Sequence, residues 1–210
     1  MIAFVNKSVF SLMLSLLIAC STLVGQEDTL TDWNLAKDKN GIQVYTRDTE
    51  NSKFKEYKSV TEMSASPERL LEILLDVEDY TTWMSNVKVA EILDQQGEDN
   101  YYIYSEVNVP WPFDNRDQIT LSEVIREPST GSIRIRITIL PDYKPEKKGV
   151  VRVSSGNGLW AFTPLGNGKT RVYHRFAGDP GGSIPAWVVN IFLVDGPYKN
   201  MIGLREKIAE

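Results

Sequence analysis

The stretch VPWPFDNRD, Val109–Asp117, stands between two runs that alternate apolar and polar residues as β-strands do, Tyr101–Val109 and Gln118–Arg126. Pro110 and Pro112 have no amide hydrogen to donate to a strand ladder, so they end one strand and stiffen a bend. The stretch therefore predicts a bend between two strands of a curved sheet.

Arg116 and Asp117 close this stretch, and the side chains of neighbouring residues point to opposite faces of an extended chain. We therefore expect each of the two to pair with a third residue rather than with the other. Asp76 and Asp79 are the candidate partners for Arg116.

Runs typical of strands continue on both sides and predict an antiparallel meander. The clearest run is Ser132–Leu140, where isoleucines alternate with Arg134 and Arg136. Asn40-Gly41 supplies the two residues with positive φ that a tight turn needs. The strands Ile42–Arg47 and Lys53–Met63, joined by the loop Asp48–Ser52, should pair as a hairpin. The other expected strands are Lys88–Leu93, Gly149–Val153, Leu159–Thr163 and Arg171–Ala177.

Short helical signals stand before and after this hairpin. Thr31–Ala36 is typical of a short capped helix whose Trp33 turns to the core. Ser66 has the position of an N-cap, followed by a proline at the first helical position and an apolar face that continues to about Asp76. A second short helix or turn is expected at residues 78–84.

The C-terminal segment Ile184–Ala209 has the spacing of one long helix, and Gly196-Pro197 within it predicts a kink or two abutting helices. Residues 187–194 are apolar nearly all round, more than packing on one sheet face requires. Either a fully packed core or a hydrophobic ligand on the other side of the helix explains this excess.

Composition limits the possible functions. The 210-residue chain has a net charge of −5 and no basic stripe interleaved with aromatic residues, which argues against nucleic acid as a partner. The only cysteine is Cys20, so we expect no disulfide in the folded part. His174 is the only histidine, and it cannot by itself supply the usual nitrogen and sulfur ligands of a metal site. No catalytic motif accompanies it, so we predict a buried polar role for His174, with no catalytic residue, metal or cofactor.

Residues 1–25 differ in kind from the rest, because a single lysine precedes the apolar run Val9–Val24. A run of about 16 residues is short for a membrane helix, which needs about 20, so the pattern indicates a signal peptide. The sequence LIAC at Leu17–Cys20 resembles a bacterial lipobox, whose cysteine receives a lipid; the alternative is cleavage after Gly25. We expect residues 26–210 to form one domain outside the cytoplasm, periplasmic or extracellular, either free or lipid-anchored through that cysteine.

The expected elements run in the order of the helix-grip fold, shared by START and Bet v 1-like proteins, in which a curved antiparallel sheet wraps a long C-terminal helix around an internal tunnel. Five local motifs, in the same order, resemble those of START domains, the steroidogenic-acute-regulatory-related lipid transfer family, in a bacterial secreted or membrane-anchored form. They run from about Trp33 to Ile208 and are Trp33-Asn34-Leu35 with Lys39–Tyr45, Phe54-Lys55, Leu75–Tyr80 with Trp83, Pro110-Trp111-Pro112 with Arg116-Asp117, and Gly178–Gly182 with Ile184-Pro185.

The resemblance implies an α+β protein that binds one lipid or sterol-like molecule in its tunnel without catalysing a reaction. It also implies a monomer that contacts membranes transiently during exchange. Trp111 and Phe113 then either cover the core at its edge or stand exposed at the tunnel mouth and touch the membrane. Sterol-binding members resemble one another in an arginine six positions after that of the Arg-Asp pair, and here that position is Ser122, so this contact is not carried over.

Two other functions stay open from the sequence. One is an enzyme of the same fold, hydrolase- or cyclase-like, acting on a hydrophobic substrate; Asp114, Asp117 and His174 would then have to meet in space. The other is an interaction domain whose tunnel is collapsed.

The predicted ligand contacts come from the strands and from the last helix. Polar tips that can orient a hydroxyl or ester group are carried by Tyr101, Tyr102 and Tyr104, together with Ser105 and Asn108. Strand register decides which of them face inward. The predicted ligand-binding residues are Tyr102, Tyr104, Leu121, Ile135, Ile137, Trp160, His174, Trp187 and Ile191.

Overall fold

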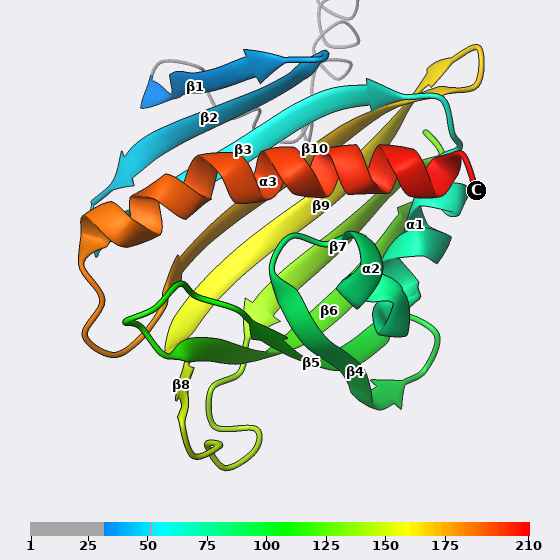
Figure 1. Ribbon diagram of the computed structural model, residues 1–210. Coiled ribbons are helices and arrows are strands. Elements are labelled where there is room, and N and C mark those ends of the chain that lie inside the picture. The colour runs from blue at the N-terminus through cyan, green and yellow to red at the C-terminus, as the bar shows by residue number, and fades with distance from the viewer. Residues whose placement is uncertain (1–31, 51) are drawn as a thin grey trace, which may run out of the picture. The chain divides into compact units, whose positions relative to one another are not determined.

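Long alternating strands make up most of the chain, and in the computed structural model they form one curved ten-stranded sheet (Figure 1). The structure describes residues 32–50 and 52–210, and Trp33–Glu210 form one unit. The predicted signal peptide, with Cys20 in it, lies outside the described residues. In the part that the structure describes, no helix is both long enough and apolar enough to cross a membrane.

The strands and helices follow the order expected from the sequence except at the first element. The strands are β1 (Asn34–Lys39), β2 (Ile42–Thr49), β3 (Ser52–Met63), β4 (Val87–Gln96), β5 (Asn100–Val107), β6 (Asn115–Glu127), β7 (Ser132–Ile139), β8 (Val150–Arg152), β9 (Ser155–Gly166) and β10 (Lys169–Asp179). The helices are α1 (Pro67–Leu75), the 3₁₀ turn η2 (Val77–Asp79), α2 (Tyr80–Trp83) and α3 (Ala186–Ile208).

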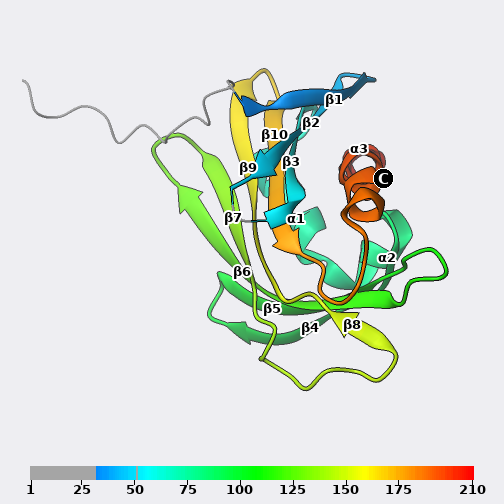
Figure 2. The same cartoon turned by 90° about the vertical axis from the view of Figure 1, so that its left-hand side faces the viewer.

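The sheet order is β1-β2-β3-β10-β9-β7-β6-β5-β4, and all neighbours on this path are antiparallel. The predicted antiparallel meander is confirmed for β4, β5, β6, β7, β9 and β10, which are successive neighbours in the sheet. The short strand β8 is the exception, because it pairs parallel with β6. The last strand, β10, lies beside β3 and joins the meander to the first three strands. Figure 2 shows the sheet curving around α3, which lies in its concave face.

The predicted helix at Thr31–Ala36 is wrong, because Asn34–Lys39 is β1 and pairs with β2. A helix of one or two turns has little stability of its own, whereas the hairpin turn at Asn40 and Gly41 places these residues beside an open strand edge. Trp33 is still buried, as predicted, and the cationic groups of Arg47 and Lys58 lie 4.4 Å and 4.5 Å from the centre of its ring.

Helix α3 is continuous through Pro197, so of the two predicted outcomes the structure excludes two abutting helices. Its inner side packs on β2 and β3, and this packing holds the helix despite the hydrogen bond that proline cannot donate.

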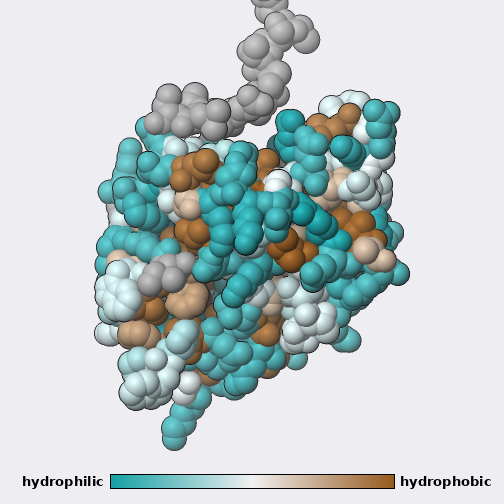
Figure 3. Space-filling view, turned by 45° about the horizontal axis from the view of Figure 1, so that its top comes forward, coloured by the Kyte–Doolittle hydropathy of each residue, from teal (hydrophilic) through white to brown (hydrophobic). Residues whose placement is uncertain are grey.

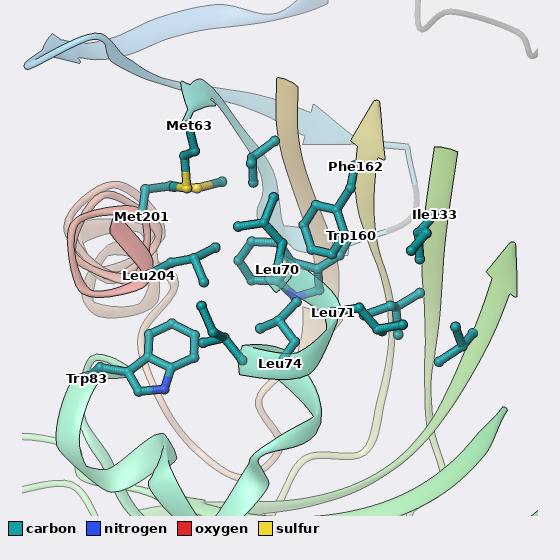
Figure 4. Close-up of a cluster of buried hydrophobic side chains, with 14 of the residues drawn as sticks. Met63, Leu70, Leu71, Leu74, Trp83, Ile133, Trp160, Phe162, Met201 and Leu204 are labelled. Atoms are coloured by element: carbon teal, nitrogen blue, oxygen red, sulfur yellow. The ribbon is translucent and has the colours of Figure 1, made fainter. Parts of the chain in front are cut away.

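The hydrophobic core fills the end of the concave face under α1 and the C-terminal half of α3. Figure 4 shows leucines of α1 pointing toward the aromatic rings of β9 and toward α3. The residues labelled there are Met63, Leu70, Leu71, Leu74, Trp83, Ile133, Trp160, Phe162, Met201 and Leu204. This core occupies one end of the concave face. Toward the other end, the side chains between the sheet and α3 surround unfilled space.

Candidate functional site

The space between the sheet and α3 contains two adjoining cavities. The inner cavity measures about 230 Å³, and the end cavity, under the N-terminal half of α3, measures about 260 Å³. Tyr57, Ser85, Val107 and Asn200 belong to the walls of both. Small-molecule sites usually measure about 300–1,000 Å³, so the two cavities reach that range only when they act together.

Strand β6 supplies the polar side of both cavities. Because strand side chains alternate between faces, Arg116, Gln118, Thr120 and Ser122 all point to the concave side. Arg116 lines the end cavity and the other three line the inner cavity, where Gln118 Nε2 donates a hydrogen bond of 3.1 Å to Ser105 Oγ. The uncharged side chains of Gln118, Thr120 and Ser122 in the inner cavity can orient one polar group of an otherwise apolar guest.

His174 lies on β10 in the wall of the inner cavity and is buried, as predicted from the sequence. Its ring stacks on that of Trp160, with centroids 3.8 Å apart and 4° between the planes. The hydroxyl of Tyr57 lies 3.4 Å from His174 Nδ1, and the two rings meet edge to face. Burial lowers the pKa of His174 to about 3, so the imidazole is neutral at physiological pH. It can therefore exchange a hydrogen bond with a guest but is a weak base.

Phe176 is a wall residue of the inner cavity whose position depends on glycines of β9 and β10. A Cβ at Gly158 would come within 2.9 Å of the Phe176 ring, and one at Gly178 within 2.8 Å. Such contacts are too short for a Cβ atom, so glycine at these two positions leaves room for the ring.

Four of the predicted ligand-binding residues lie at or beside the inner cavity. Ile137, Trp160 and His174 line it, and Ile135 lies next to them in the core cluster. The side chain of Ile191 lies outside the described side chains. Whether any of these residues contacts a ligand stays a prediction.

Three other predicted contacts face away from the cavities, because the register turns odd-numbered residues of β5 inward. Tyr102 stacks on Tyr143 at 4.8 Å, and Leu121 pairs with Tyr102 in the sheet and so shares its face. Tyr104 lines a separate surface pocket that also contains Asp117. Their prediction as cavity contacts is therefore corrected.

Trp187 is also corrected as a cavity contact. It stands in the first turn of α3, is 67% exposed and is not among the residues that line the two cavities.

Ser105, whose polar tip the sequence suggested for orienting a ligand group, lines the inner cavity. The sequence did not single out Tyr57, Thr120, Phe176 and Asn200, which also line it. A signal was present for one of them: counting back by two from the Ser122 position gives Thr120 on the same face. For the others, only the register between distant strands and the position of α3 reveal their place.

The stretch at Val109–Asp117 forms the predicted bend, since β5 ends at Val107 and β6 begins at Asn115. Trp111 is 92% exposed and does not cover the core. Phe113 packs with a small buried cluster formed by Phe54, Ile184 and Val188, so of the two alternatives it covers the core edge.

The predicted pairing of Arg116 with Asp76 or Asp79 is wrong. Arg116 Nη1 donates to the backbone carbonyl of Asp114, and Asp79 pairs with Lys207 at 3.0 Å.

Asp117 does pair with a third residue, as expected. Arg152 donates to both carboxylate oxygens of Asp117, at 2.7 Å and 3.1 Å. Because Asp117 points to the outer face and His174 to the concave face, these two residues do not meet.

Comparison with known proteins gives consistent matches. The START domain family model matches residues 23–199. An uncharacterized protein of Pseudomonas aeruginosa is 35% identical over 174 residues, which cover 83% of this chain and 85% of that protein. The phosphatidylcholine transfer protein of Mus musculus is 28% identical over 177 residues, which cover 82% of this chain and 81% of that protein. A solved structure of a STAR-related lipid transfer protein fragment from Xanthomonas axonopodis has a TM-score of 0.79 at 31% identity, covering 85% of this chain and 99% of that one.

Proposed function

Because this chain belongs to the START domain family, we propose that it binds one lipid molecule in its two adjoining cavities and carries it between membranes without catalysing a reaction. The observation that supports this best is the hollow between the sheet and α3, whose walls are largely apolar and carry a few polar groups. Burial of an alkyl chain contributes about 0.8 kcal/mol per methylene, which is enough to retain a lipid. Two relatives are named as lipid transfer proteins, which favours the same function.

The arrangement of the ionisable groups favours a carrier over an enzyme. The groups that the enzyme alternative requires do not converge, since Asp117 lies on the other face of the sheet from His174. The depressed pKa of His174, about 3, also makes it a poor general base near neutral pH.

We further propose that the end of the molecule around the end cavity touches the membrane. Trp111 and Trp187 are 92% and 67% exposed, and tryptophan is enriched at membrane interfaces. Val109 and Ile184, which lie two and three residues from these tryptophans, line the end cavity. Figure 3 shows the hydrophobic residues of one face of the molecule in small groups separated by hydrophilic ones.

Native mass spectrometry of the protein purified from its own host, followed by organic extraction, tests the carrier function. We expect one lipid per chain. Ser122→Phe, which fills the inner cavity, should lower this occupancy, whereas Leu121→Phe on the outer face of the same strand should leave it unchanged. A protein that is empty in both variants and in the wild type would contradict the proposal.

Export remains a proposal that rests on residues 1–25 alone. The mass of the mature N-terminus tests it: a chain that begins with a lipid-modified Cys20 is anchored, and one that begins with Gln26 is free. A chain that retains Met1 would show that the segment is not removed.

A further inference from the structure

Arg116 is a buried cation at the wall of the end cavity. Only 4% of the residue is exposed, and it is the one charged residue among the described residues that line this cavity. The rest of the wall is mostly apolar and includes Ile184, Val189 and Phe192. A guanidinium in such a place needs an explanation, because buried arginines are nearly always paired.

The hydrogen-bonding groups of Arg116 are mostly unused. Its guanidinium donates through Nη1 to the backbone carbonyl of Asp114, and its buried Nε has no partner. Within the described residues, no carboxylate forms an ion pair with it. Burial lowers the pKa of Arg116 more than the nearby charge of Asp114 raises it.

Arg152, on the neighbouring strand β8, is a second buried arginine, and its guanidinium has hydrogen-bond acceptors within the chain. With 6% of the residue exposed, it forms a bidentate pair with Asp117 and donates to the backbone carbonyls of Pro141 and Lys144. The contrast indicates that Arg116 is held without an anion that belongs to the chain itself.

The glycine pair Gly181-Gly182 brings the loop after β10 close to Arg116. A Cβ at Gly181 would come within 2.3 Å of the Arg152 carbonyl oxygen, and one at Gly182 would lie 3.1 Å from Val151 and 3.9 Å from Arg116 Nη2. Both glycines have positive φ, 71° and 61°. The loop therefore packs over β8 and lies beside Arg116, and its Pro180 lines the end cavity together with Arg116. An anion that occupies this cavity can therefore reach the guanidinium.

We propose that Arg116 binds the anionic group of the carried lipid, a phosphate or a carboxylate, while the apolar part of that lipid lies along α3. The inference rests on the proposed lipid-binding function. A guanidinium with free N–H groups offers the fork that such oxyanions prefer, and a charge-assisted hydrogen bond is roughly twice as strong as a neutral one. A neutral lipid would leave the cation without a counter-charge, so the site selects anionic lipids.

The test uses two pairs of lipids that differ only in the anionic group. Dioleoyl phosphatidic acid is compared with dioleoylglycerol, and oleic acid with oleyl alcohol, each in nonionic detergent with the delipidated protein. Binding is titrated through tryptophan fluorescence. The variants are Arg116→Met, which removes the charge, and Arg116→Lys, which keeps it; Arg134→Met, at an exposed position on the outer face of β7, is the matched control.

We expect the wild type to bind at least one anionic lipid about tenfold or more tightly than its neutral counterpart. Arg116→Met should lose this preference while its affinity for the neutral lipids stays the same, and Arg116→Lys should keep part of it. The lipid that shows the preference distinguishes phosphate from carboxylate. The lipid-free Arg116→Met protein should not melt below the wild type, because no carboxylate partner is lost.

Equal wild-type affinity within both pairs would overturn the inference, and this result does not depend on whether a variant folds. Equal weakening of neutral and anionic lipids in Arg116→Met would overturn it too, because the residue would then only shape the cavity. In both cases the bound neutral lipids leave the carrier function intact, whereas failure of all four lipids to bind would remove that function as well.

Discussion

Glu106 gives the most direct test of the electrostatics on the outer face of the sheet. Its side chain is 1% exposed and accepts hydrogen bonds from Lys147 Nζ and Lys88 Nζ, both at 2.8 Å, and from Asn115 Nδ2 at 3.0 Å. These bonds, with that of Lys147 the largest contribution, lower the pKa of Glu106 to about 2.

The size of the effect follows from this pKa. The ordinary value is 4.5 and the folded value about 2, and each unit corresponds to about 1.4 kcal/mol. The two lysines are half exposed, so salt screens part of the attraction and we expect about 2–3 kcal/mol. Because the folded pKa is depressed, this stability is fully present above the unfolded pKa, and it is lost as the pH falls toward the folded one.

We therefore predict that Glu106→Gln lowers the free energy of unfolding by about 2–3 kcal/mol at about pH 7. The difference from the wild type should shrink as the pH falls below about 4.5, because the wild-type carboxyl becomes protonated and resembles the amide. Urea unfolding over this pH range measures both quantities.

Glu72→Gln is the control, since Glu72 is 66% exposed and pairs with Arg69 at 3.4 Å on the surface of α1. Such a pair contributes about 1 kcal/mol or less. If Glu106→Gln costs no more than this control, or if its effect is the same at pH 7 and at acidic pH, the reasoning is refuted.

Two further predictions concern packing and buried charge. Asp117→Asn should destabilise the protein by about 3–5 kcal/mol in a urea titration, because it leaves the buried guanidinium of Arg152 without its counter-charge. Asp99→Asn is the control, since it breaks an ion pair with Arg126 whose side chains are about half exposed. It should cost about 1 kcal/mol or less. Gly203→Ala should lower the melting temperature although alanine favours helices, because its Cβ would come within 2.5 Å of the Trp83 carbonyl oxygen. Gly196→Ala, with open space around its Cβ, should raise the melting temperature. Equal effects within either pair would contradict the assigned contacts.

Local rules accounted for those parts of the fold that depend on neighbouring residues. Asn40 and Gly41 have φ values of 54° and 70°, as the tight hairpin turn requires. The hydroxyl of Ser66 accepts a hydrogen bond of 3.2 Å from the backbone amide of Arg69, which is the N-cap expected for α1. Each of these features is decided within four residues, so the sequence alone predicts it.

Features that depend on distant residues were not predictable in the same way. Asn34–Lys39 is a strand because β2 offers it an edge, not because of its own propensity. Tyr102 and Tyr104 face outward because their register with β4 and β6 turns Ile103 and Ser105 inward. A shift by one residue would exchange the two sets, and no pattern within β5 decides between them.

The same limit explains why the sequence identified Arg116 by its motif but assigned it the wrong partner. A carboxylate close in sequence or in the expected fold is a reasonable partner, and Asp76 and Asp79 both qualified. What separates Arg116 from Arg152 is the supply of acceptors around each guanidinium, a property of the packed chain: Arg152 receives a carboxylate and loop carbonyls, and Arg116 receives one carbonyl and faces a cavity. The anion that we propose for Arg116 must therefore come from the ligand, because the chain supplies no carboxylate to this guanidinium among its described residues. Only the packed structure, and not the sequence, shows that this partner is missing.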